Sequence, residues 1–546
     1  MNVRYFIISF IFVRYTYGLF QKYPLVHTRL GLIKGLRASD GDYSMFLGIP
    51  YGKVNTSNPF GVSIKYGEFN GVFEAYDDSS ICPQIEEFNS TVTGTLDCLH
   101  LNIYVPNFAT PNYSFPVLVW IYGGMFRLGF AGRYIYGPKF LVRHDIILVT
   151  LNYRLGPYGF MCLDTPEVPG NQGLKDQQLA FRWIKDNIKS FGGDPNKITL
   201  AGNSAGGMSV DFHLIFNRDN LFNKVIIQSG TTLTPTYYEP IRNAPILLAE
   251  KLGFVTNDAN VAISFLAKVN THLIIATVNN LDLIFRPCVE KEFETVDRFV
   301  TENWIQAGIP QVSNMPILIG FTNNERLYRY INCDSVYLSN LNIPKAHLVM
   351  GFDVDNKEFE NMEDIVKHYY FGDGEINEGS KLDVIDFESD YLFYHPTFRS
   401  IEKYLDNGSG NIYFYQFSYN GTRNLIKRMN NITAGGACHG DELGYLFDVS
   451  YMTEEEPTKD DLAVINYITT MWANFIKYGD PTPMTTDLLK VKWTPNTKDS
   501  PRYYLNISNE LSMGTRPYHM RMSFWDLFYK ANRHLQRVYP GKNVQT

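Results

Sequence analysis

The stretch GGDPNKITLAGNSAGG, residues Gly192 to Gly207, decides the fold because it places a serine between glycines directly after an apolar run. The run KITLA predicts a strand, and the small residues that follow Ser204 can begin a helix. In such a strand-to-helix elbow, Gly202 and Gly206 occupy positions where side chains would collide, and the sharp turn exposes the serine hydroxyl. Because Gly-x-Ser-x-Gly also occurs by chance, the flanking sequence has to support this interpretation.

The sequence before the elbow has the pattern of a helix. In residues 173–191, GLKDQQLAFRWIKDNIKSF, apolar side chains recur at about helical spacing. These side chains are Leu174, Leu179, Phe181, Ile184 and Ile188. Helix, strand, elbow and second helix is the order that a nucleophile elbow requires, so the sequence predicts that Ser204 is a nucleophile.

Short apolar runs alternate with helical patterns along the rest of the chain. This alternation indicates an α/β fold with a large, mostly parallel central sheet flanked by helices. The runs cover residues 117–124, 146–154, 197–202, 224–230, 315–321 and 411–417. Residues 30–35 and 43–52 are predicted to form an N-terminal hairpin. The irregular segments 231–311 and 333–399 are predicted to be helical insertions that wall a pocket.

Charge and composition exclude some classes of partner. The chain has 49 basic and 56 acidic side chains and a net charge of −7, which gives no electrostatic support for binding nucleic acid or an anionic membrane. A small neutral substrate suits this balance better. No linker, charge run or internal repeat divides the chain, so residues 19–546 are predicted to form a single domain.

The N-terminus has the pattern of a secretory signal. Arg4 precedes an apolar run from Tyr5 to Val13, and a polar and small stretch then reaches Gly18, which predicts a signal peptide over residues 1–18. The alternative is a buried N-terminal strand. No other stretch is long and apolar enough to span a bilayer, so a secreted protein is expected. N-glycosylation sequons begin at Asn55, Asn89, Asn112, Asn407, Asn420, Asn431 and Asn506.

Several sequence blocks together resemble the type B carboxylesterase and cholinesterase family, and insect carboxylesterases in particular. The blocks include WIYGGMF, NYRLGPYGF, GNSAGG, GFTNNER and GACHGDELGYLF, in the family's order and at about its spacings. The resemblance covers nearly the whole chain. It implies an α/β-hydrolase fold and hydrolysis of carboxylic esters through an acyl-enzyme, with no cofactor and no metal.

A serine nucleophile needs an imidazole to take its proton and a carboxylate to orient that imidazole. The resemblance places these groups at His439, in GGACHGDELGYLF, and at Glu325, in GFTNNER. The alternatives are a surface or structural histidine and an exposed loop glutamate. Asp441 and Glu442, next to His439, are substitute acids that rank lower, because neighbours in sequence rarely orient each other's rings.

Two departures from the family pattern lie beside these groups. Arg326 stands where the family usually has glycine, and arginine would strain the turn if φ there is positive; its cation could also draw Glu325 away from His439. Asn203 stands where relatives most often have glutamate, and loss of that carboxylate disfavours the imidazolium form of the histidine. The alternative is that Asn203 only fills space.

The resemblance also implies an oxyanion hole and a disulfide. Backbone donors are assigned to Gly124, Met125 and Ala205, and Met125 is expected to crowd the site, because the family usually has glycine or alanine there. The alternative for the glycines of this block is a plain tight turn. The implied disulfide joins Cys82 and Cys98. The remaining cysteines, for which buried free thiols are the alternative to pairing, are Cys162, Cys288, Cys333 and Cys438.

The function that follows is hydrolysis of a small hydrophobic ester. Acetylcholine is an unsuitable substrate, because no tryptophan lies between the paired cysteines and Phe88 is a weaker site for a quaternary ammonium. The alternative is a catalytically weak or inactive binding or adhesion protein on the same scaffold. The retention of serine, glutamate and histidine favours the enzyme. The sequence does not indicate an oligomeric state.

Overall fold

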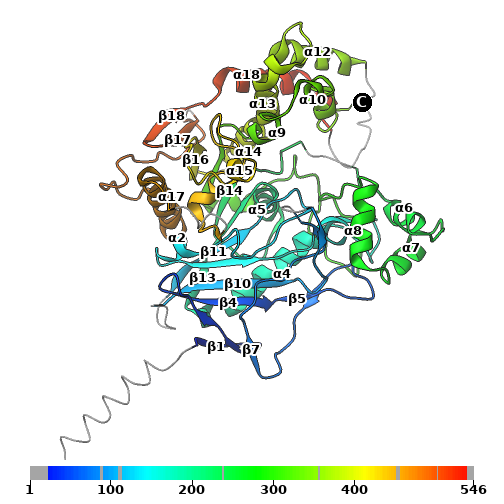
Figure 1. Ribbon diagram of the computed structural model, residues 1–546, viewed down its shortest axis with the longest axis vertical. Coiled ribbons are helices and arrows are strands. Elements are labelled where there is room, and N and C mark those ends of the chain that lie inside the picture. The colour runs from blue at the N-terminus through cyan, green and yellow to red at the C-terminus, as the bar shows by residue number, and fades with distance from the viewer. Residues whose placement is uncertain are drawn as a thin grey trace, which may run out of the picture.

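The structure is a computed structural model that describes residues 23–86, 90–107, 114–235, 239–353, 357–450, 456–500 and 502–537. The predicted signal peptide at residues 1–18, and Phe88, lie outside the described residues. Within the described part, a large sheet runs through the middle of the molecule and helices pack around it (Figure 1). The α/β fold predicted from the alternation of apolar runs and helical patterns is confirmed.

The large sheet has eleven strands among the described residues. Neighbouring strands from β12 through β11 to β17 run parallel, and antiparallel strands extend both ends. In spatial order the strands are β18 (Leu511–Thr515), β17 (Tyr503–Ile507), β16 (Ile412–Phe417), β15 (Ile317–Thr322), β14 (Lys224–Gln228), β13 (Gly193–Asn203), β11 (Phe115–Ile121), β12 (Ile147–Leu151), β10 (His100–Pro106), β4 (Tyr43–Pro50) and β3 (Leu36–Arg37).

The central strands are buried along their whole length, which explains their continuous apolar sequences. Every residue of β11, β12, β14 and β15 is buried. A strand covered by helices on both faces has no solvent side for polar residues, so its sequence does not alternate. The apolar runs therefore predicted these strands correctly.

The predicted N-terminal hairpin between residues 30–35 and 43–52 is wrong. Strand β2 (Gly31–Lys34) pairs with β1 (Leu25–Thr28) and β7 (Val72–Glu74) in a separate three-stranded sheet, whereas β4 pairs with β3 and β10. The chain changes sheets at Gly35, where a Cβ atom would lie only 2.5 Å from the Met45 carbonyl oxygen. This close approach of two backbones requires glycine.

Two helices flank the serine strand in the predicted order. Helix α4 (Gln172–Asn187) continues as a 3₁₀ turn, Ile188–Phe191, and leads into β13. Helix α5 (Ala205–Phe216) begins directly after Ser204 and is buried throughout. The shorter elements nearby are α2 (Lys139–Val142) and α3 (Gly156–Phe160).

The predicted helical insertions are confirmed. The first contains α6 (Ala244–Lys251), α7 (Ala259–Leu266) and α8 (Thr271–Asn280), which lie to one side of the sheet (Figure 1). The second contains α10 (Ser335–Ser339), α11 (Lys345–Leu348), α12 (Glu358–Phe371), α13 (Lys381–Ser389), a π-helical turn (Asp390–Tyr394) and α14 (His395–Asp406).

The remaining helices lie mainly in the C-terminal half. Helix α18 (His519–Ala531) lies near α12 and α13 at one end of the molecule (Figure 1). Among the described residues, no helix combines the length and apolar character needed to cross a bilayer. The others are α9 (Leu327–Tyr330), α15 (Leu425–Met429), α16 (Leu443–Leu446) and α17 (Lys459–Tyr478).

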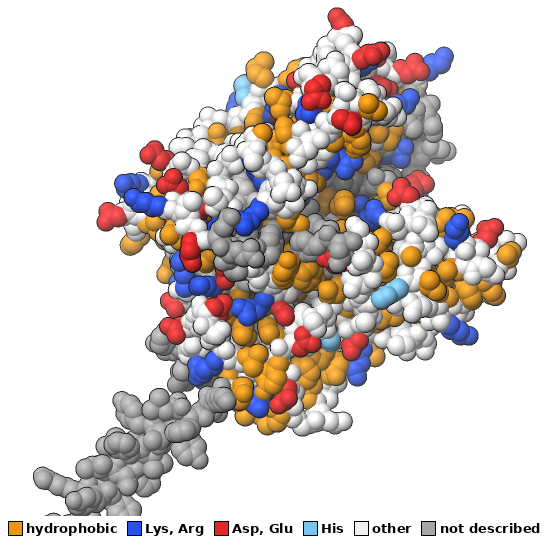
Figure 2. All heavy atoms as spheres, viewed as in Figure 1, with side chains coloured by type: hydrophobic (Ala, Val, Ile, Leu, Met, Phe, Trp, Pro, Cys, Tyr) orange, Lys and Arg blue, Asp and Glu red, His pale blue; other side chains and the backbone are white. Residues whose placement is uncertain are grey.

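Acidic and basic side chains are interspersed over the face shown in Figure 2, and neither sign forms a continuous field there. The space-filling view thus agrees with the modest net charge of −7. A nucleic-acid-binding surface of the usual kind would instead gather lysine and arginine into a patch or stripe.

Candidate active site

Ser204 lies at the sharp turn between β13 and α5. Its backbone has φ 58° and ψ −124°, a conformation that non-glycine residues rarely adopt and that is typical of functional sites. A Cβ at Gly202 would overlap the backbone of Gly206, and one at Gly206 would overlap the Ile121 carbonyl oxygen. The glycines of the motif therefore allow the close backbone contacts of this elbow.

Glu325 and His439 are brought together by hydrogen bonding. His439 Nδ1 lies 2.6 Å from Glu325 Oε2, and the His439 backbone N–H donates to the Glu325 carbonyl oxygen at 3.2 Å. The carboxylate is fully buried. Its other oxygen, Oε1, accepts from the Ser229 hydroxyl at 2.6 Å and from the Thr322 N–H at 2.8 Å. Both partners hold the carboxylate in one orientation.

The two loops that carry this pair are joined by asparagines. Asn323 Oδ1 accepts from the Ala437 N–H at 2.8 Å, and Asn324 Oδ1 accepts from the Gly436 N–H at 3.1 Å. The Asn324 N–H donates in turn to the Ala437 carbonyl oxygen. Sequence reasoning missed these residues. The signal was the NN pair in GFTNNER, because asparagine side chains readily satisfy loop backbone groups.

One cavity of about 580 Å³ contains both Ser204 and His439 in its lining. Gly124, Met125 and Asn203 also line it. Much of the remaining wall is apolar, which suits a hydrophobic ligand. The apolar part of the wall comprises Ile81, Leu128, Phe130, Ile135, Leu425, Ile426, Met429 and Leu443.

The glycine loop after β11 packs directly against the elbow. A Cβ at Gly123 would lie 2.8 Å from Ser204 Cβ, so glycine is needed there. Gly124 and Met125 both have positive φ, at 109° and 54°. The Met125 side chain is 54% exposed and lines the cavity, while its carbonyl oxygen accepts from Arg286 Nη1 at 2.7 Å. The Met125 side chain therefore occupies part of the cavity.

The two substitute acids have other partners. Asp441 accepts hydrogen bonds from the backbone N–H groups of Ile426, Lys427 and Cys438, and thereby orders the histidine loop. Glu442 Oε1 accepts from Gln228 Nε2 at 2.9 Å and from Asn203 Nδ2 at 3.4 Å. Neither carboxylate is the hydrogen-bond partner of the His439 ring nitrogen Nδ1, which is paired with Glu325.

Burial changes the ionisation of Glu442. Desolvation raises the pKa of Glu442 to about 7, and the nearby negative charge of Glu325 adds to this rise. The hydrogen bond from Gln228 and the proximity of His439 oppose it. Near neutral pH a second buried carboxyl group close to His439 therefore exists in both protonated and ionised forms.

Arg326 does not behave as the sequence suggested. Its φ is −101°, so the expected strain is absent. Its cation does not draw Glu325 away from His439 either, because Arg326 Nε pairs with Glu388 Oε2 at 2.5 Å. Its backbone N–H donates to Ser389 Oγ at 3.1 Å. The arginine thus ties the glutamate turn to the end of α13.

Aromatic side chains pack against the histidine ring. The Phe393 ring centroid lies 4.8 Å from that of His439, and the Tyr328 ring lies 6.5 Å away at 24° to it. Phe393 belongs to the π-helical turn, which widens the helix there. Tyr394, in the same turn, approaches the Glu325 N–H through its hydroxyl oxygen at 3.4 Å. Sequence reasoning missed this turn, since one inserted helical residue leaves no motif.

The cysteines form two disulfides. Cys82 pairs with Cys98, as the resemblance implied, with Cα atoms 5.0 Å apart. Cys162 pairs with Cys288, which the sequence did not indicate because 126 residues separate them. The alternative that Cys162 and Cys288 are free thiols is therefore wrong. Cys333 and Cys438 are free.

The chain matches the model of the carboxylesterase family over residues 22–525. It is 30% identical to esterase B1 from Culex pipiens over 92% of this chain and 98% of the relative. It is 29% identical to juvenile hormone esterase from Heliothis virescens over 86% of this chain and 88% of the relative.

A solved structure is similar over almost the full length. The crystal structure of juvenile hormone esterase from Manduca sexta, with OTFP covalently attached, superposes with a TM-score of 0.80 at 25% identity. The match covers 93% of this chain and all of that one. The chain belongs to the carboxylesterase family, type B, and is a carboxylic ester hydrolase with the α/β-hydrolase fold.

Proposed function

We propose that Ser204, His439 and Glu325 form a catalytic triad that hydrolyses small hydrophobic carboxylic esters through an acyl-enzyme. The observation that carries this proposal is the 2.6 Å hydrogen bond between His439 and a buried Glu325, at a cavity that Ser204 also lines. With Nδ1 engaged by the carboxylate, Nε2 is the nitrogen left to accept the serine proton. The apolar cavity wall supports a hydrophobic substrate.

The reaction proceeds in two halves. Ser204 Oγ attacks the ester carbonyl carbon while His439 takes its proton, and the imidazolium then protonates the leaving alcohol. Water, deprotonated by the same imidazole, attacks the acyl-enzyme and releases the acid. The backbone N–H groups of Gly124, Met125 and Ala205 are proposed to stabilise the oxyanion, and each such donor is worth about 100- to 1,000-fold in rate.

Secretion is part of the proposal. The described residues contain two disulfides, and disulfides persist in oxidising compartments. The sequence of residues 1–18 has the pattern of a signal peptide. The ester is therefore expected to be met outside the cell.

Hydrolysis of p-nitrophenyl acetate by the wild type and by Ser204→Ala tests the function. The wild type is expected to show a burst of p-nitrophenol and covalent labelling by a fluorophosphonate, and the variant neither, because the acyl-enzyme cannot form. Ser264→Ala, an exposed serine on α7, is the matched control and should keep both. Equal rates for wild type and Ser204→Ala would favour a binding protein on this scaffold.

A further inference from the structure

A second cavity, of about 60 Å³, shares no lining residue with the cavity that Ser204 lines. Three segments lead to it from the serine. Phe126 follows Met125 in the glycine loop after β11, which we call the oxyanion loop. Met208 lies one turn along α5, and Thr232 follows β14. The Met208 N–H donates to the Ser204 carbonyl oxygen at 2.9 Å. The cavity therefore adjoins the catalytic centre.

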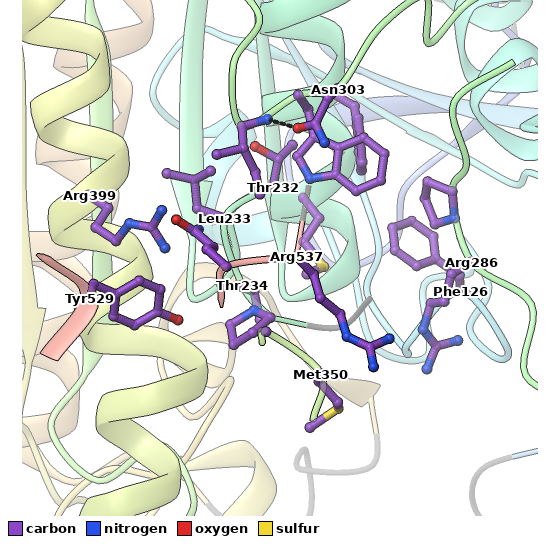
Figure 3. Close-up of a pocket in the computed structure, with 18 residues that line it drawn as sticks. Phe126, Thr232, Leu233, Thr234, Arg286, Asn303, Met350, Arg399, Tyr529 and Arg537 are labelled. Carbon is purple, nitrogen blue, oxygen red and sulfur yellow. Dashed lines mark hydrogen bonds between the residues drawn. The ribbon is translucent and has the colours of Figure 1, made fainter. Parts of the chain in front are cut away.

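The lining of this cavity is strongly basic. Arg286, Arg399 and Arg537 come from three separate parts of the chain, and none of the described lining residues is acidic. Figure 3 shows the Arg286 and Arg537 guanidinium groups turned to the same side, with Arg399 beside Tyr529 across the cavity. Guanidinium groups remain charged at all relevant pH values. Three positive charges therefore surround a small space.

The protein itself does not neutralise two of these charges. Among the described residues, neither Arg399 nor Arg537 forms an ion pair with a carboxylate. Arg399 stacks over the Tyr529 ring at 4.5 Å, and Arg537 Nε donates to the Phe352 carbonyl oxygen at 2.9 Å. These contacts orient the guanidinium groups but use few of their five N–H donors each. Donors remain for an anion.

The rest of the lining is largely apolar. Phe126, Phe212, Leu233 and Trp304 belong to it. One water molecule needs about 10–15 Å³ of cavity volume. The cavity, at about 60 Å³, therefore accommodates only a few waters or a carboxylate with one or two methylene groups. A planar carboxylate also matches the fork of a guanidinium group. The ligand that fits is thus a carboxylate on an apolar chain.

We propose that this cavity is a subsite for a carboxylate, carried either by the acyl chain of the ester or by a free carboxylic acid. The inference rests on the proposed ester hydrolysis and specifies its substrate or effector. Arg286 also binds the Met125 carbonyl oxygen at 2.7 Å, so a carboxylate held there contacts the residue that positions the oxyanion loop.

The test for a carboxylate on the acyl chain compares two series of p-nitrophenyl esters. One series consists of monoesters of dicarboxylic acids of increasing length, and the other has the distal carboxylate capped as a methyl ester. At one chain length the wild type should prefer the free carboxylate in kcat/KM by about ten- to hundredfold, the worth of a charge-assisted hydrogen bond. Arg537→Gln and Arg399→Gln should each lower this ratio about tenfold.

Arg37→Gln is the matched control, because Arg37 is exposed on the edge strand β3 and is not one of the residues that line this cavity. It should leave the ratio unchanged. Thermal midpoints establish that the variants fold, and Arg399→Lys, which keeps the charge but not the guanidinium fork, should lower the ratio less than Arg399→Gln does.

The test for a free acid as the ligand is calorimetry of butanoate, which has two methylene groups, with Ser204→Ala protein, in which hydrolysis plays no part. Binding that is weakened about tenfold by Arg537→Gln, with butanol as the uncharged control, supports a free acid as the ligand. Identical ester ratios and identical butanoate binding in wild type and both arginine variants would overturn the proposal. Failure of the wild type to hydrolyse any ester would count against the proposed function, while butanoate binding would still decide the subsite.

Discussion

Asn203 lies between the loop that carries His439 and Glu442. Its Nδ2 donates to Glu442 Oε1 at 3.4 Å, and a Cβ at Gly440, next to His439, would lie 3.6 Å from Asn203 Oδ1. The residue therefore does more than fill space. It presents a neutral amide where a carboxylate would place a second negative charge beside the imidazole.

Asn203→Glu is expected to move the acidic limb of the kcat/KM profile to higher pH by about one unit. A new carboxylate stabilises the imidazolium form, so a higher pH is needed to obtain the neutral base. The measurement is kcat/KM for p-nitrophenyl acetate between about pH 4 and pH 9. Asn203→Gln, of the same length as glutamate and uncharged, should leave the limb in place. An unmoved limb in Asn203→Glu would contradict the idea.

Glu442 gives the folded protein a pH-dependent stability. Its pKa rises from 4.5 to about 7 because it is desolvated and close to Glu325, so the folded state binds its proton more tightly than the unfolded chain. This contribution is fully present below about pH 4.5 and is lost as pH rises to about 7, in total about 3 kcal/mol.

Glu442→Gln should remove this dependence, since glutamine can still accept the hydrogen bond from Gln228. Urea unfolding at several pH values measures it. The free energy of unfolding of the wild type should fall by about 3 kcal/mol more than that of the variant between pH 4.5 and pH 7. Burial also raises the pKa of Asp441 to about 6, so Asp441 makes the free energy of unfolding depend on pH in both proteins. Subtracting the variant from the wild type removes this shared dependence. Parallel curves would exclude a buried, protonated Glu442.

At the scale of elements, the glutamate turn is held to α13 by an ionic cluster. Glu388, on α13, accepts from Arg326, from His347 at 2.8 Å and from the Tyr330 hydroxyl. Burial alone would raise the pKa of Glu388, but the Arg326 guanidinium and His347 together hold it below its ordinary value. The cluster joins an inserted helix to the turn that carries Glu325.

Arg326→Ala is expected to lower the free energy of unfolding by about 3 kcal/mol, because it leaves a buried carboxylate without its main counter-charge. Adding Glu388→Gln should recover part of this loss, since the uncompensated charge is then removed. Urea denaturation of the wild type, both single variants and the double variant gives the coupling energy between the two side chains. Strictly additive losses would show that the pair is not coupled.

The sequence predicts the elements around the serine better than the contacts that support them. Gly202, Gly206 and the apolar runs restrict local backbone conformation, so the elbow and its strands could be predicted directly. The partner of Arg326 could not, because Glu388 lies 62 residues away and on an inserted helix. Without that partner, the expectations for Arg326 were strain in the turn and competition with His439 for Glu325. The sheet edge formed by the C-terminal strands β17 and β18 was likewise not predicted, because these strands are short and partly polar.

At the scale of the whole molecule, the first insertion is fastened to the core by a disulfide. Cys162 follows α3 and Cys288 follows α8, and the segment between them includes α4, β13, the elbow and α6 to α8. Next to the bond, Asn171 Nδ2 donates to the Cys288 carbonyl oxygen at 2.7 Å and to Glu290 Oε1 at 2.8 Å. Lys175 pairs with the other oxygen of Glu290 at 2.6 Å. The start of α4 and the end of the insertion are thus joined by covalent and polar contacts.

Replacing both cysteines, Cys162→Ala with Cys288→Ala, should lower the free energy of unfolding by about 2–4 kcal/mol, because the unfolded chain regains the entropy of a long loop. Guanidinium denaturation measures the loss. Dithiothreitol should destabilise the wild type but change the double variant less, since only Cys82–Cys98 then remains to be reduced. Cys333→Ala removes a free thiol and serves as the control. If the double variant matched the wild type, the polar contacts of Asn171 and Glu290 would suffice to hold the insertion, and the disulfide would not be needed for stability.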